Sequence, residues 1–191
     1  MPILGIIASS LLAAAGDFES IATVTVGGGG AANVEFTSIP GTYTHLQVRA
    51  IFRNTNESGG GNEQFLRMQC NSDTTANYSW QYLQGGGGAA AAADAISQTE
   101  IEFNYPIPMS NDLANTFGVG IIDVLDYKNT NKYKTVRALA GANCNGSTSK
   151  LITFSSGLWQ STSAITSIKF YPKEDNFSQY SQFALYGIKG A

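Results

Sequence analysis

The sequence is poor in charged residues and in the side chains that most often build chemical sites. Of its 191 residues, 13% are charged, the formal net charge is −3, and the chain has one histidine, His45. The lack of a basic surplus excludes an electrostatic footprint for nucleic acid or for an anionic membrane surface. Because sulfur and imidazole ligands are so scarce, a zinc site is excluded as well, and no metal or cofactor is expected.

Cysteine is scarce too, with only Cys70 and Cys144. Two cysteines do not make the disulfide framework of a small secreted domain. Cys70 ends an expected strand, whereas Cys144 lies in an Asn-rich loop. Both are therefore expected to be reduced thiols.

The chain also lacks a long apolar run, and the most apolar stretch is residues 3–15. It is shorter than the roughly 20 apolar residues that span a bilayer, so no membrane insertion is expected. It ends in small residues like a signal peptide, but no Lys or Arg precedes it. We interpret residues 1–16 as an apolar anchoring arm and residues 17–191 as one domain. The arm supplies the candidate partner-docking residues, which are Ile3, Leu4, Ile6, Ile7, Leu11 and Leu12.

What the chain does contain is a series of short stretches in which apolar and polar residues alternate. In residues 44–53, for example, Leu46, Val48, Ala50 and Phe52 fall on one face. About ten or eleven such stretches, with Gly- and Asn-rich turns between them and no amphipathic helix, are typical of antiparallel β-sandwiches. The sequence therefore predicts an all-β fold, a jelly-roll-like antiparallel β-sandwich preceded by the apolar arm.

The pattern also predicts local features. Residues 22–26 and 33–37 are expected to pair as a hairpin. Residues 85–93, four glycines and then five alanines, are expected to form a flexible loop over a sheet edge, with a short helix as the alternative. The last strand, within residues 176–189, and the stretch 117–125 carry apolar residues on both faces, so both are expected inside a sheet. Asp123 interrupts the second of these and needs a partner, for which Tyr133 or Arg137 is suitable.

No catalytic site is expected, and the chain is predicted to be non-enzymatic. There is no Gly-x-Ser-x-Gly motif, and His45 has no Ser or Asp at a useful offset. Glu100 and Glu102 lie on one strand face, about 6–7 Å apart, as a glycosidase pair could. They alternate with core residues, however, as surface carboxylates do. The spacing of Asp123, Asp126 and Asn129 does not fit an EF-hand calcium loop.

Aromatic residues form the candidate glycan site. Tyr78, Trp80 and Tyr82 share one face of an expected strand, and Trp159 lies in an expected glycine-flanked turn. Flat aromatic rings can stack on sugar rings, whereas an alternating aromatic stripe is also typical of a sandwich core. Trp159 is the better surface candidate of the four.

Several segments resemble short virion proteins of tailed phages. They are MPILGIIASS at residues 1–10, SIATVTV at 20–26, TYTHLQVR at 42–49, DYKNTNKYKTVR at 126–137 and FSQYSQFALYG at 177–187. The resemblance runs over nearly the whole chain. It implies a β-sandwich on the outside of a virion, often in a symmetric oligomer, and it carries no catalytic residues.

These observations predict a non-enzymatic structural protein at the virion surface, made in the host cytoplasm. It would be a capsid decoration protein or a short fibre or knob, anchored to other virion proteins of the capsid or tail through its arm. Self-association is expected, as a homotrimer. The alternative is a carbohydrate-binding receptor-recognition module of a tail fibre, with a host surface glycan as ligand.

Overall fold

The computed structural model describes residues 16–57, 65–105, 107–145 and 150–190, so residues 1–15 of the arm lie outside the described residues. Within these ranges the chain forms β-strands and no helix, and accordingly no helix that could cross a membrane. The predicted all-β fold is confirmed. The strands are β1 (Phe18–Thr25), β2 (Val34–Phe36), β3 (His45–Phe52), β4 (Leu66–Cys70), β5 (Tyr78–Gly86), β6 (Ala89–Gln98), β7 (Ile101–Phe103), β8 (Gly118–Val124), β9 (Lys134–Asn143), β10 (Lys150–Trp159), β11 (Ile168–Pro172) and β12 (Gln182–Ile188).

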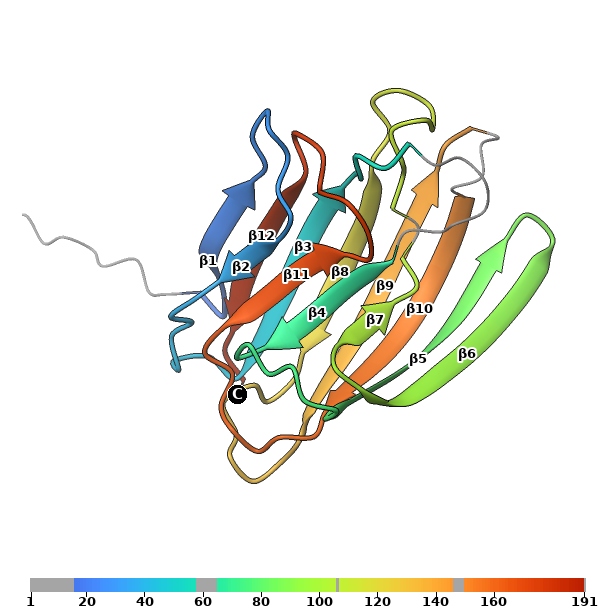
Figure 1. The fold of residues 1–191 in the computed structure, drawn as a ribbon. Coiled ribbons are helices and arrows are strands. Elements are labelled where there is room, and N and C mark those ends of the chain that lie inside the picture. The colour runs from blue at the N-terminus through green and yellow to red at the C-terminus, as the bar shows by residue number, and fades with distance from the viewer. Residues whose placement is uncertain (1–15, 58–64, 106, 146–149, 191) are drawn as a thin grey trace, which may run out of the picture.

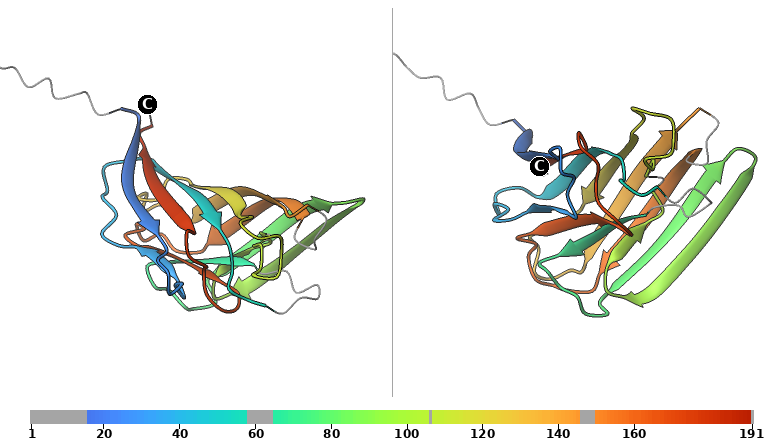
Figure 2. Two further views of the ribbon diagram at one scale, coloured as in Figure 1. Left: turned by 90° about the horizontal axis from the view of Figure 1, so that it is seen from above. Right: turned by 45° about the horizontal axis from the view of Figure 1, so that its top comes forward.

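The strands form two antiparallel sheets packed face to face as a sandwich (Figure 1). The large sheet has eight strands in the order β1-β12-β3-β8-β9-β10-β5-β6, and the small sheet has four in the order β2-β11-β4-β7. The small sheet lies over one face of the large sheet, and the β5–β6 hairpin extends past it at one edge (Figure 2). Among the described residues, no second layer lies on the other face of the large sheet.

The predicted hairpin between residues 22–26 and 33–37 is wrong, because the chain changes sheets between them. β1 pairs with β12, which places Val24 opposite Phe183. β2 pairs with β11 in the small sheet, which places Val34 opposite Phe170. The crossing lets Val26 and Val34 turn into the space between the layers, where both are buried.

The core lies between the two sheets and centres on Phe183 of β12. Its ring stacks on Phe52 of β3 at a centroid distance of 6.0 Å and on Phe170 of β11 at 5.6 Å. It also meets Phe177 at 5.0 Å, and all four side chains are fully buried. Because β3 and β12 belong to one sheet and β11 to the other, this cluster joins the layers.

The C-terminal strand lies inside the large sheet, as predicted, with β1 on one side and β3 on the other. Its backbone also approaches the core closely. A Cβ atom at Gly187 would lie 2.3 Å from the ring of Tyr43, so only glycine fits there. β8 is central as well, between β3 and β9.

The glycine and alanine stretch at residues 85–93 is a hairpin, so its prediction as a flexible loop is wrong. β5 ends at Gly86 and β6 begins at Ala89, which leaves a two-residue turn of Gly87 (φ +59°) and Gly88 (φ +134°). Such turns need positive φ, and glycine adopts it at little cost. The turn sets the register, in which the alanines pair with β5 although alanine itself has a low strand preference.

Candidate functional site

The uncovered face of the large sheet carries a band of large apolar side chains. Successive residues of a strand point to opposite faces, and the register aligns those on one face into rows across the strands. One row joins Ile51, Val119, Gly141, Ile152 and Gly85, and the next joins Arg49, Ile121, Leu139, Phe154 and Leu83. We call the seven large apolar members of these rows the apolar band: Ile51, Val119, Ile121, Leu139, Ile152, Phe154 and Leu83.

The apolar band is exposed to solvent in the described part of the chain. Its seven side chains are between 41% and 68% exposed. With about 4.8 Å between strands and two rows of residues along them, the band covers on the order of 300–400 Å². Patches of this size commonly mark interaction sites.

The middle of this face is hollowed into a groove. Its volume is about 510 Å³, and its lining comes from β3, β8, β9, β10 and β12. Small residues such as Gly141 and Ala184 lie among larger ones such as Ile121 and Leu139. The large side chains thus surround a depression that could bind a convex apolar group.

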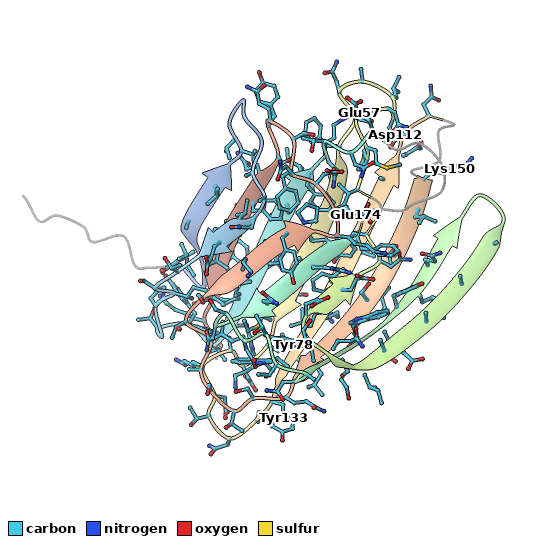
Figure 3. The ribbon with its side chains drawn as sticks, in the orientation of Figure 1. Glu57, Tyr78, Asp112, Tyr133, Lys150 and Glu174 are labelled. Atoms are coloured by element: carbon cyan, nitrogen blue, oxygen red, sulfur yellow. The ribbon has the colours of Figure 1, made fainter. Side chains whose placement is uncertain are left out.

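A polar row borders the apolar band on one side. Asp123 accepts hydrogen bonds from Gln47 (2.8 Å) and from Arg137 (2.9 Å), and Gln47 in turn accepts one from Arg49 (3.0 Å). The prediction of Arg137 as the partner of Asp123 is confirmed. Tyr133, the other suggested partner, lies at the turn between β8 and β9 (Figure 3) and is 53% exposed.

An aromatic pair lies at the edge of the groove next to the start of the described chain. The ring of Phe18 on β1 stacks on Tyr186 at 4.8 Å, and the guanidinium of Arg49 lies 5.3 Å and 5.7 Å from the two ring centroids. Tyr186 and Arg49 both line the groove. The arm therefore joins the domain beside the groove.

Two of the four predicted glycan-binding residues are buried. Trp159 is 2% exposed, its Nε1 donates to Asp73 at 2.7 Å, and its ring stacks on Tyr78 at 6.3 Å. Tyr78, labelled in Figure 3, is 1% exposed, and its hydroxyl donates to the Cys70 carbonyl. The prediction that Trp159 lies at the surface is wrong. Gly157 marks no turn but a place in β10 where a Cβ atom would lie 2.6 Å from Ile101.

The other two, Trp80 and Tyr82, are half-buried and stack on each other at 6.0 Å. They share a face of β5 with Tyr78, as predicted, and this face is the one that continues the core. The four aromatic residues therefore do not converge on one exposed platform. Half of the predicted set serves to pack the sandwich.

The candidate carboxylates pair with an arginine, and the two candidate thiols are buried. Arg67 lies 2.7 Å from Glu102 and 3.7 Å from Glu100, so the two carboxylates share one cation. The described residues hold no group of three or more His, Cys, Asp or Glu placed to bind a metal. Cys70 and Cys144 are free, as expected, and both are buried.

The contacts of His45 and Asp126 hold the turn between β8 and β9 in place. The Nδ1 atom of His45 accepts the backbone N–H of Asp126 at 3.0 Å. The Asp126 carboxylate meets Lys132 at 2.7 Å, and these contacts, with the hydrogen bond from Lys132 first, hold the pKa of Asp126 below its usual value. The contacts tie the β8–β9 turn to the start of β3.

Asp73 has the most strongly lowered pKa of the described carboxylates. Burial, the largest single influence, raises its pKa, but hydrogen bonds from Thr75, Trp159 and Asn77 together outweigh it and lower the pKa from 3.8 to about 2. The folded state thus favours the ionised Asp73 carboxylate more strongly than the unfolded state does. The resulting stability is fully present above pH 3.8 and is lost as the pH falls through 2.

We expect acidification from about pH 4 to pH 2 to remove on the order of 1–2 kcal/mol of stability through this one group. Denaturant unfolding as a function of pH should show this loss in the wild type, and the Asp73→Asn variant should show a profile flatter by that amount. Parallel profiles for the two proteins would mean that the Asp73 hydrogen bonds do not favour its ionised form.

Comparison of the chain with protein-family models, with curated proteins and with solved structures finds no match.

Proposed function

We propose that this chain is a non-enzymatic structural protein on the exterior of a tailed-phage virion, a capsid decoration protein or a short fibre or knob. In this proposal it joins other virion proteins, further copies of itself included, through its apolar surfaces, the arm at residues 1–16 and the uncovered sheet face. The observation that carries the proposal is the apolar band.

The apolar band favours a role in assembly because it departs from the usual pattern of an antiparallel sheet. When one face packs on the core and the other meets water, strands normally alternate apolar-in and polar-out. β8 instead presents Val119 and Ile121 outward while Ile122 and Val124 face the core. Apolar residues on the outer face cost solubility and are useful when another protein covers them.

The strand order is a second support. The chain passes from the large to the small sheet and back through β1, β2, β3 and β4. The four-strand groups β1-β12-β3-β8 and β2-β11-β4-β7 are in the order expected for the two layers of a jelly roll, in which case β5–β6 and β9–β10 would be added hairpins. Viral capsid domains are among the proteins that use this fold, and this support is an analogy at the level of the fold.

The resemblance of five segments to tailed-phage virion proteins supports the location. Those segments include residues 1–10 of the arm and most of β12. The arm carries no charged side chain and six large aliphatic ones, a composition that suits a segment anchored in another protein.

The proposal is tested on particles of the phage whose genome encodes the chain. We expect the chain to co-purify with particles through a density gradient and to bind an antibody against the folded domain on intact particles. A variant without residues 1–15 should remain soluble in the lysate and be absent from particles. Recovery of the full chain only in the soluble fraction would overturn the proposed function, and recovery of the truncated chain in particles would overturn the anchoring role of the arm.

A further inference from the structure

We infer that the groove in the apolar band is occupied by the arm of a second copy of this chain, so that copies associate by exchanging arms. The inference rests on the proposed structural role and specifies the partner that the arm contacts. Four properties of the described residues and of the sequence carry it, and they concern chemistry, shape, reach and direction.

The chemistry of the arm matches that of the groove. Residues 1–15 contain no Asp, Glu, Lys or Arg side chain, and they carry the six aliphatic residues of the docking set. The groove is lined by aliphatic side chains such as Ile51, Val119 and Leu139. Arm and groove can therefore come together without burying an unpaired charged side chain, which would be costly.

The shape of the groove favours a narrow segment over a second sheet. Two copies that met face to face would bring two hollows together, and the space between them would stay empty. Interiors that are stable are close-packed, so such a contact would lose much of its dispersion energy. An extended arm is convex and can place alternate side chains into a hollow of about 510 Å³.

The arm is long enough to reach a neighbouring molecule. It joins the domain at Gly16, two residues before Phe18, whose ring stacks on Tyr186 at the edge of the groove. Fifteen residues in extended form span up to about 50 Å, which exceeds the width of the whole sheet at about 4.8 Å per strand. Length therefore does not limit which copy the arm binds.

The direction of β1 favours the groove of another copy. The two rows of the apolar band meet β12 at Gln182 and Ala184, which pair with Thr25 and Thr23 of β1. Phe18 lies at the other end of β1, opposite Ile188. Asp17 continues this pairing, since its carbonyl accepts the backbone N–H of Lys189 at 2.9 Å, so the described chain before Phe18 runs away from its own band. An arm that returned to it would have to reverse and cross the row of Tyr186, Gln47, Asp123 and Arg137. An arm that enters a neighbour need not reverse.

Arm and groove are different surfaces, so their contact is heterologous. Such contacts close as a ring, or as a reciprocal pair if each copy gives and receives one arm, and they build open filaments where the geometry does not close. We expect closure, because a closed form leaves no arm and no groove without a partner. The wild-type chain should therefore be a small closed oligomer at equilibrium. Removing either surface should leave monomers.

The experiment uses two defective variants that can rescue each other. One lacks residues 1–15 and keeps the groove, and the other is Leu139→Glu, which keeps the arm but places a carboxylate in the groove. The matched control is Leu113→Glu, since Leu113 is a leucine of similar exposure (49% against 53%) in the loop before β8. Circular dichroism and thermal unfolding establish that all of them are folded, and analytical ultracentrifugation measures their masses.

We expect the wild type and Leu113→Glu to be oligomers and the two defective variants to be monomers when alone. Mixed together, they should form a heterodimer with one copy of each, because an intact arm then meets an intact groove. A labelled peptide of residues 1–15 with a short lysine tail should bind the truncated chain, and Leu139→Glu in that chain should weaken binding by at least about tenfold.

The inference is overturned if the truncated chain keeps the wild-type mass, if the two variants do not combine, or if Leu139→Glu leaves peptide affinity unchanged. A monomeric wild type, in which the arm covers its own groove, would overturn it as well. A different result would reject the proposed function. Arm exchange in the purified protein together with its absence from particles would reject the virion role alone, and presence in particles without arm exchange would reject only this inference.

Discussion

Replacing Phe183 by alanine should lower the free energy of unfolding by about 3–5 kcal/mol, the usual cost of removing a buried phenylalanine. The ring is fully buried and contacts Phe52, Phe170 and Phe177 from both layers of the sandwich. Its loss leaves a cavity at the point where the sheets meet. Because small domains have only about 5–15 kcal/mol of stability, the variant should be close to unfolding at physiological temperature.

Phe154→Ala is the matched control, since it removes the same side chain from the other face of the same sheet. Phe154 is 49% exposed in the described chain. At a protein concentration at which the wild type is dissociated, this change should cost less than about 1 kcal/mol. Urea unfolding followed by fluorescence measures both variants. Equal losses would mean that the outer face is buried within the isolated molecule, contrary to the sandwich described above.

Lys134→Met should lower the free energy of unfolding by about 2–4 kcal/mol, because it removes a donor from buried carbonyl groups. Lys134 is fully buried, and its ammonium group donates to the carbonyl oxygens of Asn129 at 2.6 Å and Lys132 at 2.8 Å. It also reaches those of Thr162 at 3.3 Å and Ser161 at 3.5 Å. The side chain thereby joins the β8–β9 turn to the segment that follows β10.

Burial lowers the pKa of Lys134, since desolvation disfavours its charged form. The hydrogen bonds to carbonyl dipoles offset part of this cost, and methionine of similar length cannot replace them. Lys132→Met is the control, because Lys132 is 61% exposed and pairs with Asp126 at the surface. It should cost less than about 1 kcal/mol. If both variants unfold like the wild type in urea, the carbonyl cage of Lys134 contributes nothing to stability.

The fold class and the orientation of most side chains could be predicted from sequence because both depend on local alternation. Leu46, Val48 and Phe52, for example, all face the core of the sandwich. The pairing of β1 and β2 could not be predicted in this way. Alternation shows which face of a strand is apolar, but the partner strand is set by contacts with β11 and β12, more than a hundred residues later.

The candidate site was missed for a physical reason. Apolar residues on both faces of residues 117–125 predicted a central strand, which is correct. Such a pattern is usual where both faces of a sheet are covered. The cover of one face is not found among the described residues, since Val119 and Ile121 stay 52% and 41% exposed. The useful signal in the sequence was that apolar residues occur on both faces of later strands too. Leu139 in β9 and Ile152 and Phe154 in β10 lie on the face opposite the core. Such a recurrence indicates a second apolar surface, but only the register shows that these residues form one band.

Trp159 was predicted at the surface but is buried. A glycine before a tryptophan predicted an exposed turn, whereas Gly157 makes room for Ile101 within the core. The same residue type therefore marks a turn at Gly87 and a close packing contact at Gly157. Sequence alone does not separate these two uses of glycine, because the contact comes from a strand far away in the chain.

A three-dimensional reconstruction of the virion by electron cryo-microscopy tests the central claim most directly. The apolar band should be covered by protein density in van der Waals contact with Ile121 and Leu139, and this density should be traceable to the N-terminal residues of an adjacent copy. A reconstruction in which this face of the domain points into solvent, with the chain held to the particle by other surfaces, would contradict the claim.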